Sequence, residues 1–390
     1  MKKDTKIIHA GRDKKWSGQT VSPPVYHAST ILHDSVAELN DATKNIGNNA
    51  LFYGRRGTPT HFAFREAMVE LEGGHGCLVY PSGLAAINAA LMTYLSAGDH
   101  LLMVDTVYGP TRTLCDTVLA RMGVEATYYD PCIGKNIEDL IQKNTKVIYT
   151  ESPGSVTMEI QDIPAITNVA HANDVMVMID NTYGNLINFD PYKHGVDVSI
   201  QAATKYIVGH SDAMLGTITT TEKYWKKLFH QSYAMGYTAG PDDIDRAMRG
   251  IRTIKTRLTQ HEKSALKIAK WLEAQDVVDK ILHPAFPSCP GHDIWKRDFD
   301  GSNGLFSFTF KHGDDKSITA FLDNLNLFKM CFSWGGFESL AMSFYDLKNE
   351  RSLNLWNNYG PLVRLHVGLE DVNDLIADLE QGIEHFKNAL

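Results

Sequence analysis

Residues 197–211 read DVSIQAATKYIVGHS, and the lysine in this stretch, Lys205, differs from an ordinary solvated lysine. A β-prone segment leads into the small residues Ala202 and Ala203 just before it. An amine held among small apolar groups has its charged form disfavoured, which makes it a better nucleophile near neutral pH. Such lysines form Schiff bases with carbonyl compounds, including pyridoxal phosphate (PLP). From this stretch alone, a solvated lysine at a strand end fits equally well.

The stretch with this lysine is the last of five short apolar runs in the chain, and most of the runs are separated by a helical stretch. They are CLVYPSG, HLLMVDTVYG, KVIYTESPGS, VMVMIDNTYG and DVSIQAATK. Such runs predict an α/β fold with a mostly parallel sheet that is covered on both faces. Ligands bind at the carboxyl ends of the strands in these sheets. We therefore expect one crevice to be faced by the polar residues that follow the runs, namely Ser82 with Gly83, Tyr108, Glu151 with Ser152, Asp180 and Lys205.

Changes of pattern along the chain predict three parts. Residues 1–55 are expected to form an irregular arm that wraps a neighbouring subunit. Residues 56–250 carry the alternating helices and strands of a large domain. Residues 251–390 begin with a long helix at 251–272 and end with another at 371–390, with short strands between them. This last part is predicted to be a smaller C-terminal α/β domain.

Composition limits the possible classes of function. The chain has 390 residues, of which 43% are hydrophobic and 22% charged, as in a globular protein with an ample core. Its net charge of -8 argues against nucleic acid or an anionic membrane as the main partner. Five scattered cysteines without CxxC spacing predict a reducing compartment, with neither disulfides nor a metal site. Because no signal peptide or membrane-length apolar run is visible, we expect a cytoplasmic protein.

The segment YPSGLAAINAALMTYL joins a strand to a helix through Ser82 and Gly83. Free backbone N–H groups and the helix dipole make such a helix start a phosphate site, although an ordinary strand–helix turn looks the same. The chain has no G-x-G-x-x-G and no G-x-x-x-x-G-K-[ST], so a dinucleotide or P-loop site has little support.

Two further residues at strand ends point to a ring-shaped ligand. Asp180 closes the run VMVMID, where its carboxylate needs a positive partner or several donors. The protonated nitrogen of a pyridine ring would suit it, and a helix N-cap is the alternative. Tyr108 offers a flat face for stacking and a hydroxyl for proton transfer, although an isolated tyrosine is more often part of a core.

Arginines outside these runs suggest anion sites. Arg55, with Tyr53 in FYGRRGTPTH, lies in a glycine-rich loop where a guanidinium can grip a phosphate, and its neighbour Arg56 is a rival. Arg364, on the apolar strand of PLVRLHVGLED, needs a carboxylate from the protein or from a substrate. The sequence SWGG at 333–336 precedes it and could line the same pocket.

Together these residues resemble the Cys/Met-metabolism family of PLP-dependent enzymes, over essentially the whole chain. The segments that carry the resemblance include LFYGRRGTPTH, ELEGGHGCLVYPSG, ESPGSVTMEI, MIDNTYG, DVSIQAATKYIVGHSDAM, FSWGGFESL and VRLHVGLEDVNDLI. The resemblance implies the fold of PLP-dependent transferases (aminotransferase-like). It also implies a homotetramer made of two dimers, with active sites shared between two subunits.

The resemblance assigns a role to each candidate residue. It implies that Lys205 binds PLP covalently and then moves protons, that Asp180 pairs with the pyridine nitrogen, and that Tyr108 stacks on the ring and assists catalysis. The implied phosphate ligands are the backbone of Gly83 and Leu84, the hydroxyl of Thr204, and Tyr53 and Arg55 of the neighbouring subunit. The implied substrate-binding residues are Ser333, Trp334 and Arg364.

The implied activity is that of a carbon–sulfur β-lyase. It would cleave a small thioether amino acid, L-cystathionine, to homocysteine, pyruvate and ammonia. Trp334 supports this activity, because γ-synthases and γ-lyases of the family usually have leucine after the serine.

Three departures from the family pattern keep other substrates open. Ala202 stands where many members have serine, Ser155 stands where asparagine is frequent, and the segment 341–359, which is expected to border the substrate entrance, differs from the β-lyase pattern. The alternatives are a β-lyase acting on cystine, cysteine or S-alkylcysteines, and a γ-lyase or γ-synthase. A PLP-binding protein without catalysis is disfavoured, because Lys205, Asp180, Tyr108 and Arg364 occur together.

Overall fold

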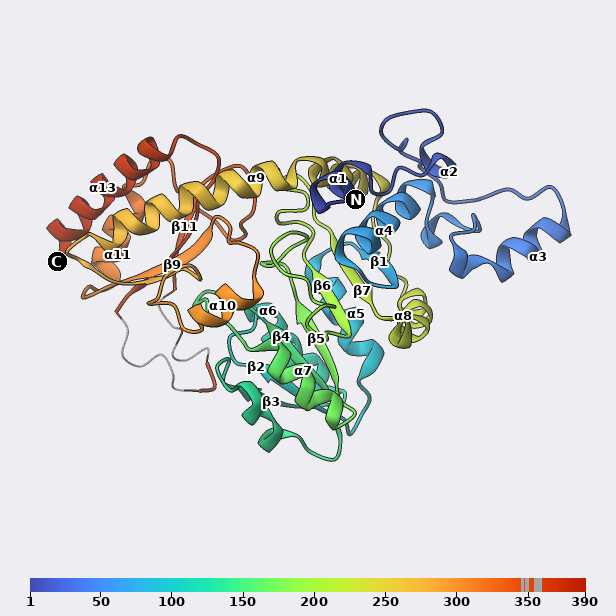
Figure 1. The fold of residues 1–390 in the computed structure, drawn as a ribbon, viewed down its shortest axis with the longest axis horizontal. Helices are drawn as coiled ribbons and strands as arrows, with labels where there is room; N and C mark the ends of the chain where they lie inside the picture. Colours follow the sequence, from blue (N-terminus) through green and yellow to red (C-terminus); the bar gives the residue numbers. More distant parts are fainter. Residues whose placement is uncertain (345–346, 348–350, 354–359) are drawn as a thin grey trace.

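The computed structural model describes every residue of the chain except 345–346, 348–350 and 354–359. Two sheets organise the described part, a large sheet of seven strands and a small sheet of five (Figure 1). Helices alternate with the strands of the large sheet, and most of its neighbouring strands run parallel. The α/β fold class predicted from the sequence is therefore confirmed.

The large sheet has the strand order β1-β7-β6-β5-β4-β2-β3. β7 runs antiparallel to both of its neighbours, and the other pairs are parallel. Every residue of β1, β2 and β5 is buried, which explains why these strands read as continuous apolar runs. The bounds are β1 Gly76–Tyr80, β2 His100–Val104, β3 Glu125–Tyr129, β4 Thr145–Glu151, β5 Met176–Asp180, β6 Val198–Gln201 and β7 Gly216–Thr220.

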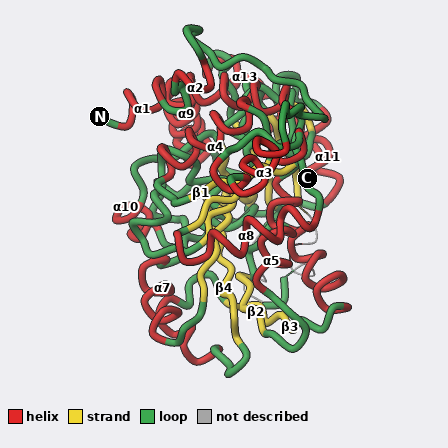
Figure 2. Tube along the Cα trace, turned by 90° about the vertical axis from the view of Figure 1, so that its right-hand side faces the viewer, coloured by secondary structure: helices red, strands yellow, loops and turns green. Residues whose placement is uncertain are grey.

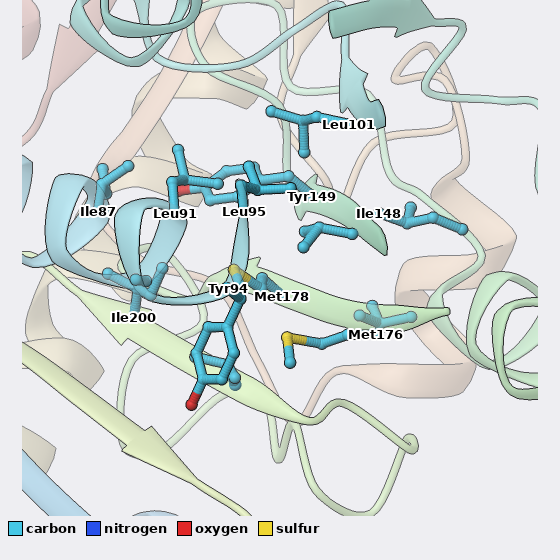
Figure 3. Packing of buried hydrophobic residues seen from close by; sticks show 14 of the residues in the cluster. Ile87, Leu91, Tyr94, Leu95, Leu101, Ile148, Tyr149, Met176, Met178 and Ile200 are labelled. Carbon is cyan, nitrogen blue, oxygen red and sulfur yellow. The ribbon is translucent and has the colours of Figure 1, made fainter. Parts of the chain in front are cut away.

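Helices cover both faces of the large sheet (Figures 1 and 2). Side chains of α5, among them Ile87 and Leu91, pack in one cluster with strand residues such as Tyr149 and Met178 (Figure 3). Alternate residues of β1 belong to a second cluster, which contains α4 and α9. The bounds are α4 Pro59–Glu72, α5 Gly83–Tyr94, α6 Gly109–Thr113, α7 Ile163–Ala172 and α8 Glu222–Met235. The 3-10 helices are η1 Ile46–Asn48, η2 Gly54–Arg56 and η4 Gly134–Leu140, and η3 Leu114–Leu119 is a π-helix.

Capping residues at both ends fix the bounds of α4. Thr58 and His61 form a reciprocal capping box at the start, with Pro59 in the first turn. Gly73 ends the helix with a φ of 96°, in the left-handed region that favours glycine.

The N-terminal arm is less irregular than the sequence predicts. It contains α1 Lys3–His9, α2 Lys14–Ser17 and α3 Val36–Lys44. Ile7 and Ala10 are buried against α4 and α9, and Arg252 donates hydrogen bonds to their carbonyls at 2.6 and 2.9 Å. The start of the arm is therefore part of the core, whereas α3 and the chain leading to it extend away from the sheets (Figure 1).

The small sheet has the order β10-β11-β12-β9-β8, in which only the β10–β11 pair is parallel among the described strands. α9, α11 and α13 lie on one side of it (Figure 1). The bounds are β8 Val278–Leu282, β9 Leu305–Phe310, β10 Lys329–Met330, β11 Leu340–Phe344, β12 Leu362–His366, α9 Pro241–Glu273, α10 His292–Asp298, α11 Asp315–Asp323 and α13 Val372–Ala389.

Helix α9 links the two sheets. It begins ten residues before the predicted start at 251 and passes through the predicted domain boundary. Its first half packs on the core of α1 and α4, and its second half packs on the small sheet. No helix among the described residues has both the length and the apolar character needed to cross a bilayer.

Candidate active site

The carboxyl ends of β1, β2, β4, β5 and β6 meet at one edge of the large sheet, because these strands point the same way. Glu151 and Asp180 close β4 and β5 and are direct partners in the register. Lys205 follows β6 after three residues, and Tyr108 follows β2 at the start of α6. The parallel sheet thus gathers the strand-end residues that the sequence singles out.

A tight turn holds Lys205. Its N–H donates to the Ala202 carbonyl at 3.0 Å, and its carbonyl accepts from the Gly209 N–H at 2.8 Å. The amine Nζ donates to Ser333 Oγ at 2.6 Å and lies 5.5 Å from the centre of the Trp334 ring.

Burial lowers the pKa of the Lys205 amine to about 8, and the nearby Arg364 guanidinium acts in the same direction. The Asp180 carboxylate and the Cys331 thiol oppose this shift. At a pKa of about 8, roughly a tenth of the amine is uncharged at pH 7, against less than about a thousandth for a lysine with its ordinary pKa. An uncharged amine can act as a nucleophile and as a base.

Asp180 is buried, and one of its carboxylate oxygens is fixed by Thr182. Asp180 Oδ1 accepts from the Thr182 N–H at 3.0 Å and from its hydroxyl at 2.5 Å. The same hydroxyl accepts from the Ala202 N–H at 2.8 Å, which ties Asp180 to the lysine turn. Burial raises the pKa of Asp180, and the bonds from Thr182 and the charge of Lys205 act against this shift. No helix lies between β5 and β6, a segment that the structure describes in full, so the N-cap alternative is wrong.

Tyr108 is half-exposed, and its backbone is anchored to the sheet. Its N–H donates to Glu151 Oε2 at 2.8 Å. Burial raises the pKa of its hydroxyl, the carboxylates of Asp180 and Glu151 add to the shift, and Arg364 opposes it. The sequence places Glu151 at the crevice but assigns it no role. Its contact with Tyr108 depends on strand register, which the sequence does not reveal.

The start of α5 lies against the lysine turn. Ser82 caps the helix by accepting from the Ala85 N–H at 3.1 Å, and the N–H groups of Gly83 and Leu84 are in the first turn, where a helix provides no acceptor. A Cβ on Gly83 would lie 2.5 Å from that of Ala202, so only glycine allows this close approach.

Of the predicted phosphate ligands, Thr204 and Arg55 have other partners in the single chain, and Tyr53 is exposed. The Thr204 hydroxyl accepts from the Leu215 N–H at 2.9 Å and donates to the Leu215 carbonyl at 3.2 Å. Arg55 donates to the Tyr233 carbonyl at 3.0 Å, and Tyr53 is 42% exposed. Within the described part of the chain, no hydrogen bond joins the side chains of Tyr53 or Arg55 to the surroundings of Lys205.

Arg364 projects from β12, the central strand of the small sheet, toward the same crevice. Burial lowers the pKa of its guanidinium to about 10, and Tyr108 opposes this shift. Its guanidinium lies 5.1 Å from the Phe344 ring centre, and among the described residues it forms no hydrogen bond or ion pair. A half-buried guanidinium without an acceptor among the described residues is suited to an anionic ligand.

The segment 341–359, expected to border the substrate entrance, lies partly outside the described residues. Its described residues 351–353 contact the carboxyl end of β2. Ser352 and Leu353 donate backbone N–H groups to the Asp105 carboxylate at 2.9 and 3.3 Å. Arg351 donates to the Asp105 carbonyl and, at 2.9 Å, to that of Ser155. These contacts lie at the sheet edge that carries Tyr108.

Comparison with known proteins assigns the chain to a family. The family described as Cys/Met metabolism PLP-dependent enzyme matches residues 4–384. The chain belongs to this PLP-dependent family. Its cofactor is therefore pyridoxal phosphate.

Relatives within the family cover the chain almost completely. The cystathionine beta-lyase of Haemophilus influenzae is 45% identical over 97% of both chains, and cystathionine beta-lyase MetC of Escherichia coli is 45% identical over 98% of both. A solved structure of cystathionine gamma-lyase from Lactobacillus plantarum, complexed with L-serine, has a TM-score of 0.90 and 32% identity over 99% of this chain and 100% of that chain. The fold is thus that of PLP-dependent lyases.

The residues at the sheet edge fit PLP chemically. The aldehyde of PLP requires an amine with a lowered pKa, which Lys205 has. The ring nitrogen requires a buried carboxylate, which Asp180 supplies. The phosphate requires backbone N–H donors, which the start of α5 offers.

Proposed function

We propose that this protein cleaves L-cystathionine by β-elimination and releases homocysteine, pyruvate and ammonia. Relatives of 45% identity over nearly the full length are cystathionine beta-lyases. The single observation that carries the proposal is the Lys205 amine, which has a lowered pKa, donates to the Ser333 hydroxyl and is close enough to the Asp180 carboxylate to feel its charge.

Each residue at the sheet edge has a proposed task. Arg364 and the loop of Ser333 and Trp334 bind the substrate carboxylate and turn the Cα–H bond toward Lys205. Bound PLP supplies an electron-accepting ring that stabilises the charge left at Cα. Asp180 holds a proton on the ring nitrogen, and Tyr108 holds the ring plane by stacking.

Proton transfer is assigned to Lys205. Its uncharged Nζ takes the proton from the substrate Cα, and the resulting ammonium gives a proton to the leaving sulfur as the Cβ–S bond breaks. Homocysteine leaves as the thiol. The remaining three-carbon fragment takes up water and yields pyruvate and ammonia. Arg364 favours the return of Lys205 to its uncharged form, because its charge disfavours an ammonium nearby.

The choice between β- and γ-elimination is tested by the keto acid that the enzyme releases. With L-cystathionine we expect pyruvate, because attack on the Cβ–S bond leaves a three-carbon fragment, whereas γ-elimination would leave 2-oxobutanoate. Separation of the two keto acids by chromatography decides between them. The same assay with cystine and S-alkylcysteines ranks the β-substrates. Release of mainly 2-oxobutanoate from cystathionine would refute the proposal.

The lowered pKa of Lys205 predicts how the cofactor-free protein takes up PLP. Only the uncharged amine attacks the aldehyde, so the rate should rise with pH and level off above a midpoint near 8. A lysine with its ordinary pKa would still be gaining reactivity above pH 9. Stopped-flow absorbance of PLP uptake measures this profile. A midpoint above pH 10 would show that the amine is not desolvated.

We propose that the cofactor site is completed by a neighbouring subunit, in a homotetramer. The support is the part of the N-terminal arm that follows α2. It exposes the apolar side chains of Val21, Leu32 and Val36 to solvent. Tyr53 and Arg55 lie at the end of this arm. In the proposed dimer they reach the phosphate of the neighbouring site, and the Thr204 hydroxyl turns from Leu215 to the same phosphate.

We further propose a division into an arm of residues 1–55, a large PLP-binding domain of 56–250 and a small domain of 251–390, with α9 spanning the last boundary.

We also propose a cytoplasmic location. All five cysteines are unpaired, as is usual in a reducing compartment.

A further inference from the structure

Tyr206, the residue after Lys205, joins the lysine turn to the small sheet. Its side chain is 1% exposed. Its hydroxyl donates to Asn303 Oδ1 and accepts from the Gly304 N–H, both at 3.0 Å. Gly304 immediately precedes β9. The Tyr206 hydroxyl therefore connects the lysine turn, which follows β6 of the large sheet, with the start of β9 in the small sheet.

The ring of Tyr206 contacts the loop that holds Ser333. Its centre lies 5.6 Å from that of Trp334 and 5.9 Å from that of His366. His366 Nε2 accepts from the Gly335 N–H at 3.1 Å and so fixes the same loop. Gly335 has a φ of +87°, and a Cβ there would lie 3.0 Å from the Cα of Lys205. The lysine turn and the loop are therefore packed without free space.

The backbone of Tyr206 is fixed from the opposite side by α9. Arg257 Nη2 donates to the Tyr206 carbonyl at 2.8 Å and to the Gly250 carbonyl at 2.7 Å. The guanidinium also packs against Gly209, where a Cβ would overlap Nη1. Arg257 is 6% exposed and has no carboxylate partner among the described residues. Its contacts join the lysine turn to the helix that links both sheets.

We propose that Tyr206 is a positioning residue, which fixes the Lys205 amine relative to the loop of Ser333 and Trp334. The inference rests on the proposed function of Lys205 as the cofactor-binding amine. Lys205 and Tyr206 are neighbours in the chain, so a shift of the Tyr206 side chain moves the Lys205 Cα. A misplacement of about 1 Å at a reacting group can cost about 10²-fold in rate.

The variant Tyr206→Phe tests this proposal, because it removes one oxygen atom and keeps the ring. The Gly304 N–H then loses its acceptor and Asn303 Oδ1 keeps only the Leu305 N–H, so the turn can move away from the small sheet. We expect kcat/KM for cystathionine to fall about tenfold or more. We also expect the midpoint of the pH-dependent PLP uptake to rise, since a looser turn admits water to Lys205. The charged and titratable groups that face the amine, Asp180, Arg364 and Cys331, remain in place.

Tyr129→Phe is the matched control. Tyr129, on β3, is equally buried. Its hydroxyl lies 3.0 Å from the carbonyl of Tyr149, on β4, and 2.9 Å from Oε1 of Gln161, in the loop before α7, so neither partner is on the lysine turn. Both variants lose a buried hydroxyl, so both should lower the melting temperature. Only Tyr206→Phe should move the pH midpoint and kcat/KM.

The proposal is overturned if Tyr206→Phe keeps the wild-type pH midpoint and kcat/KM, or if Tyr129→Phe changes both equally. If Tyr206→Phe does not fold, Arg257→Lys replaces it. Lysine keeps the charge but cannot donate to both carbonyls in the same geometry, so the same two shifts are expected and their absence refutes the proposal. Failure of the proposed function is distinguishable, because wild-type protein would then release no pyruvate.

Discussion

An alanine at position 205 will lower the turnover of cystathionine by about 10⁴-fold or more while leaving the fold intact. The variant removes the amine that binds the cofactor and the group that moves the proton from Cα to sulfur. No other amine can replace it, since among the described residues Lys205 is the lysine that contacts Ser333 and lies near Asp180. The side chain is partly exposed, so its loss should change stability little.

Two measurements on Lys205→Ala separate a chemical from a structural defect. Pyruvate release gives kcat, and the visible absorbance of the purified protein reports covalent attachment of PLP, which should disappear. Lys193→Ala, at an exposed position outside the site, is the control and should match the wild type. Added methylamine should restore part of the activity to the alanine variant only. Full activity in Lys205→Ala would contradict the assignment.

The sequence predicts the large sheet well because the relevant signals are local. Buried strands such as β2 and β5 read as apolar runs, and their carboxyl ends share one edge in any parallel sheet. Asp180, Lys205 and Tyr108 could therefore be placed together from the sequence alone. The resemblance adds the PLP chemistry, which no spacing in the sequence requires.

The parts that the sequence does not predict depend on contacts between distant residues. α1 is expected to be irregular, yet Ile7 is buried by α4 and α9, more than fifty residues away in the chain. α9 starts at Pro241 with two acidic residues in its first turn, a start signal that is present but less visible than the apolar pattern from 251. The anchoring of Tyr108 by Glu151 and the contacts of Tyr206 depend on register and packing.

Replacing Arg364 by methionine will lower kcat/KM for cystathionine by about 10² to 10³-fold. Methionine keeps the bulk and the contact with Phe344 but cannot donate to a carboxylate. Because the guanidinium of Arg364 has no acceptor among the described residues, its loss leaves no protein group unpaired. The effect should therefore fall on substrate binding, and the melting temperature should stay close to that of the wild type or rise.

The same variant has an effect that does not involve substrate. The charge of Arg364 helps to lower the pKa of the Lys205 amine, so its removal should raise that pKa and move the midpoint of PLP uptake above pH 8. Arg364→Lys should keep the midpoint near that of the wild type but recover only part of kcat/KM, since lysine restores the charge and not the paired donors. Arg246→Met removes an exposed arginine of α9 and should change neither quantity.

If Arg364→Met lowers kcat/KM without moving the midpoint, Arg364 binds substrate but does not set the reactivity of Lys205. If it moves the midpoint and leaves kcat/KM unchanged, the substrate carboxylate binds elsewhere.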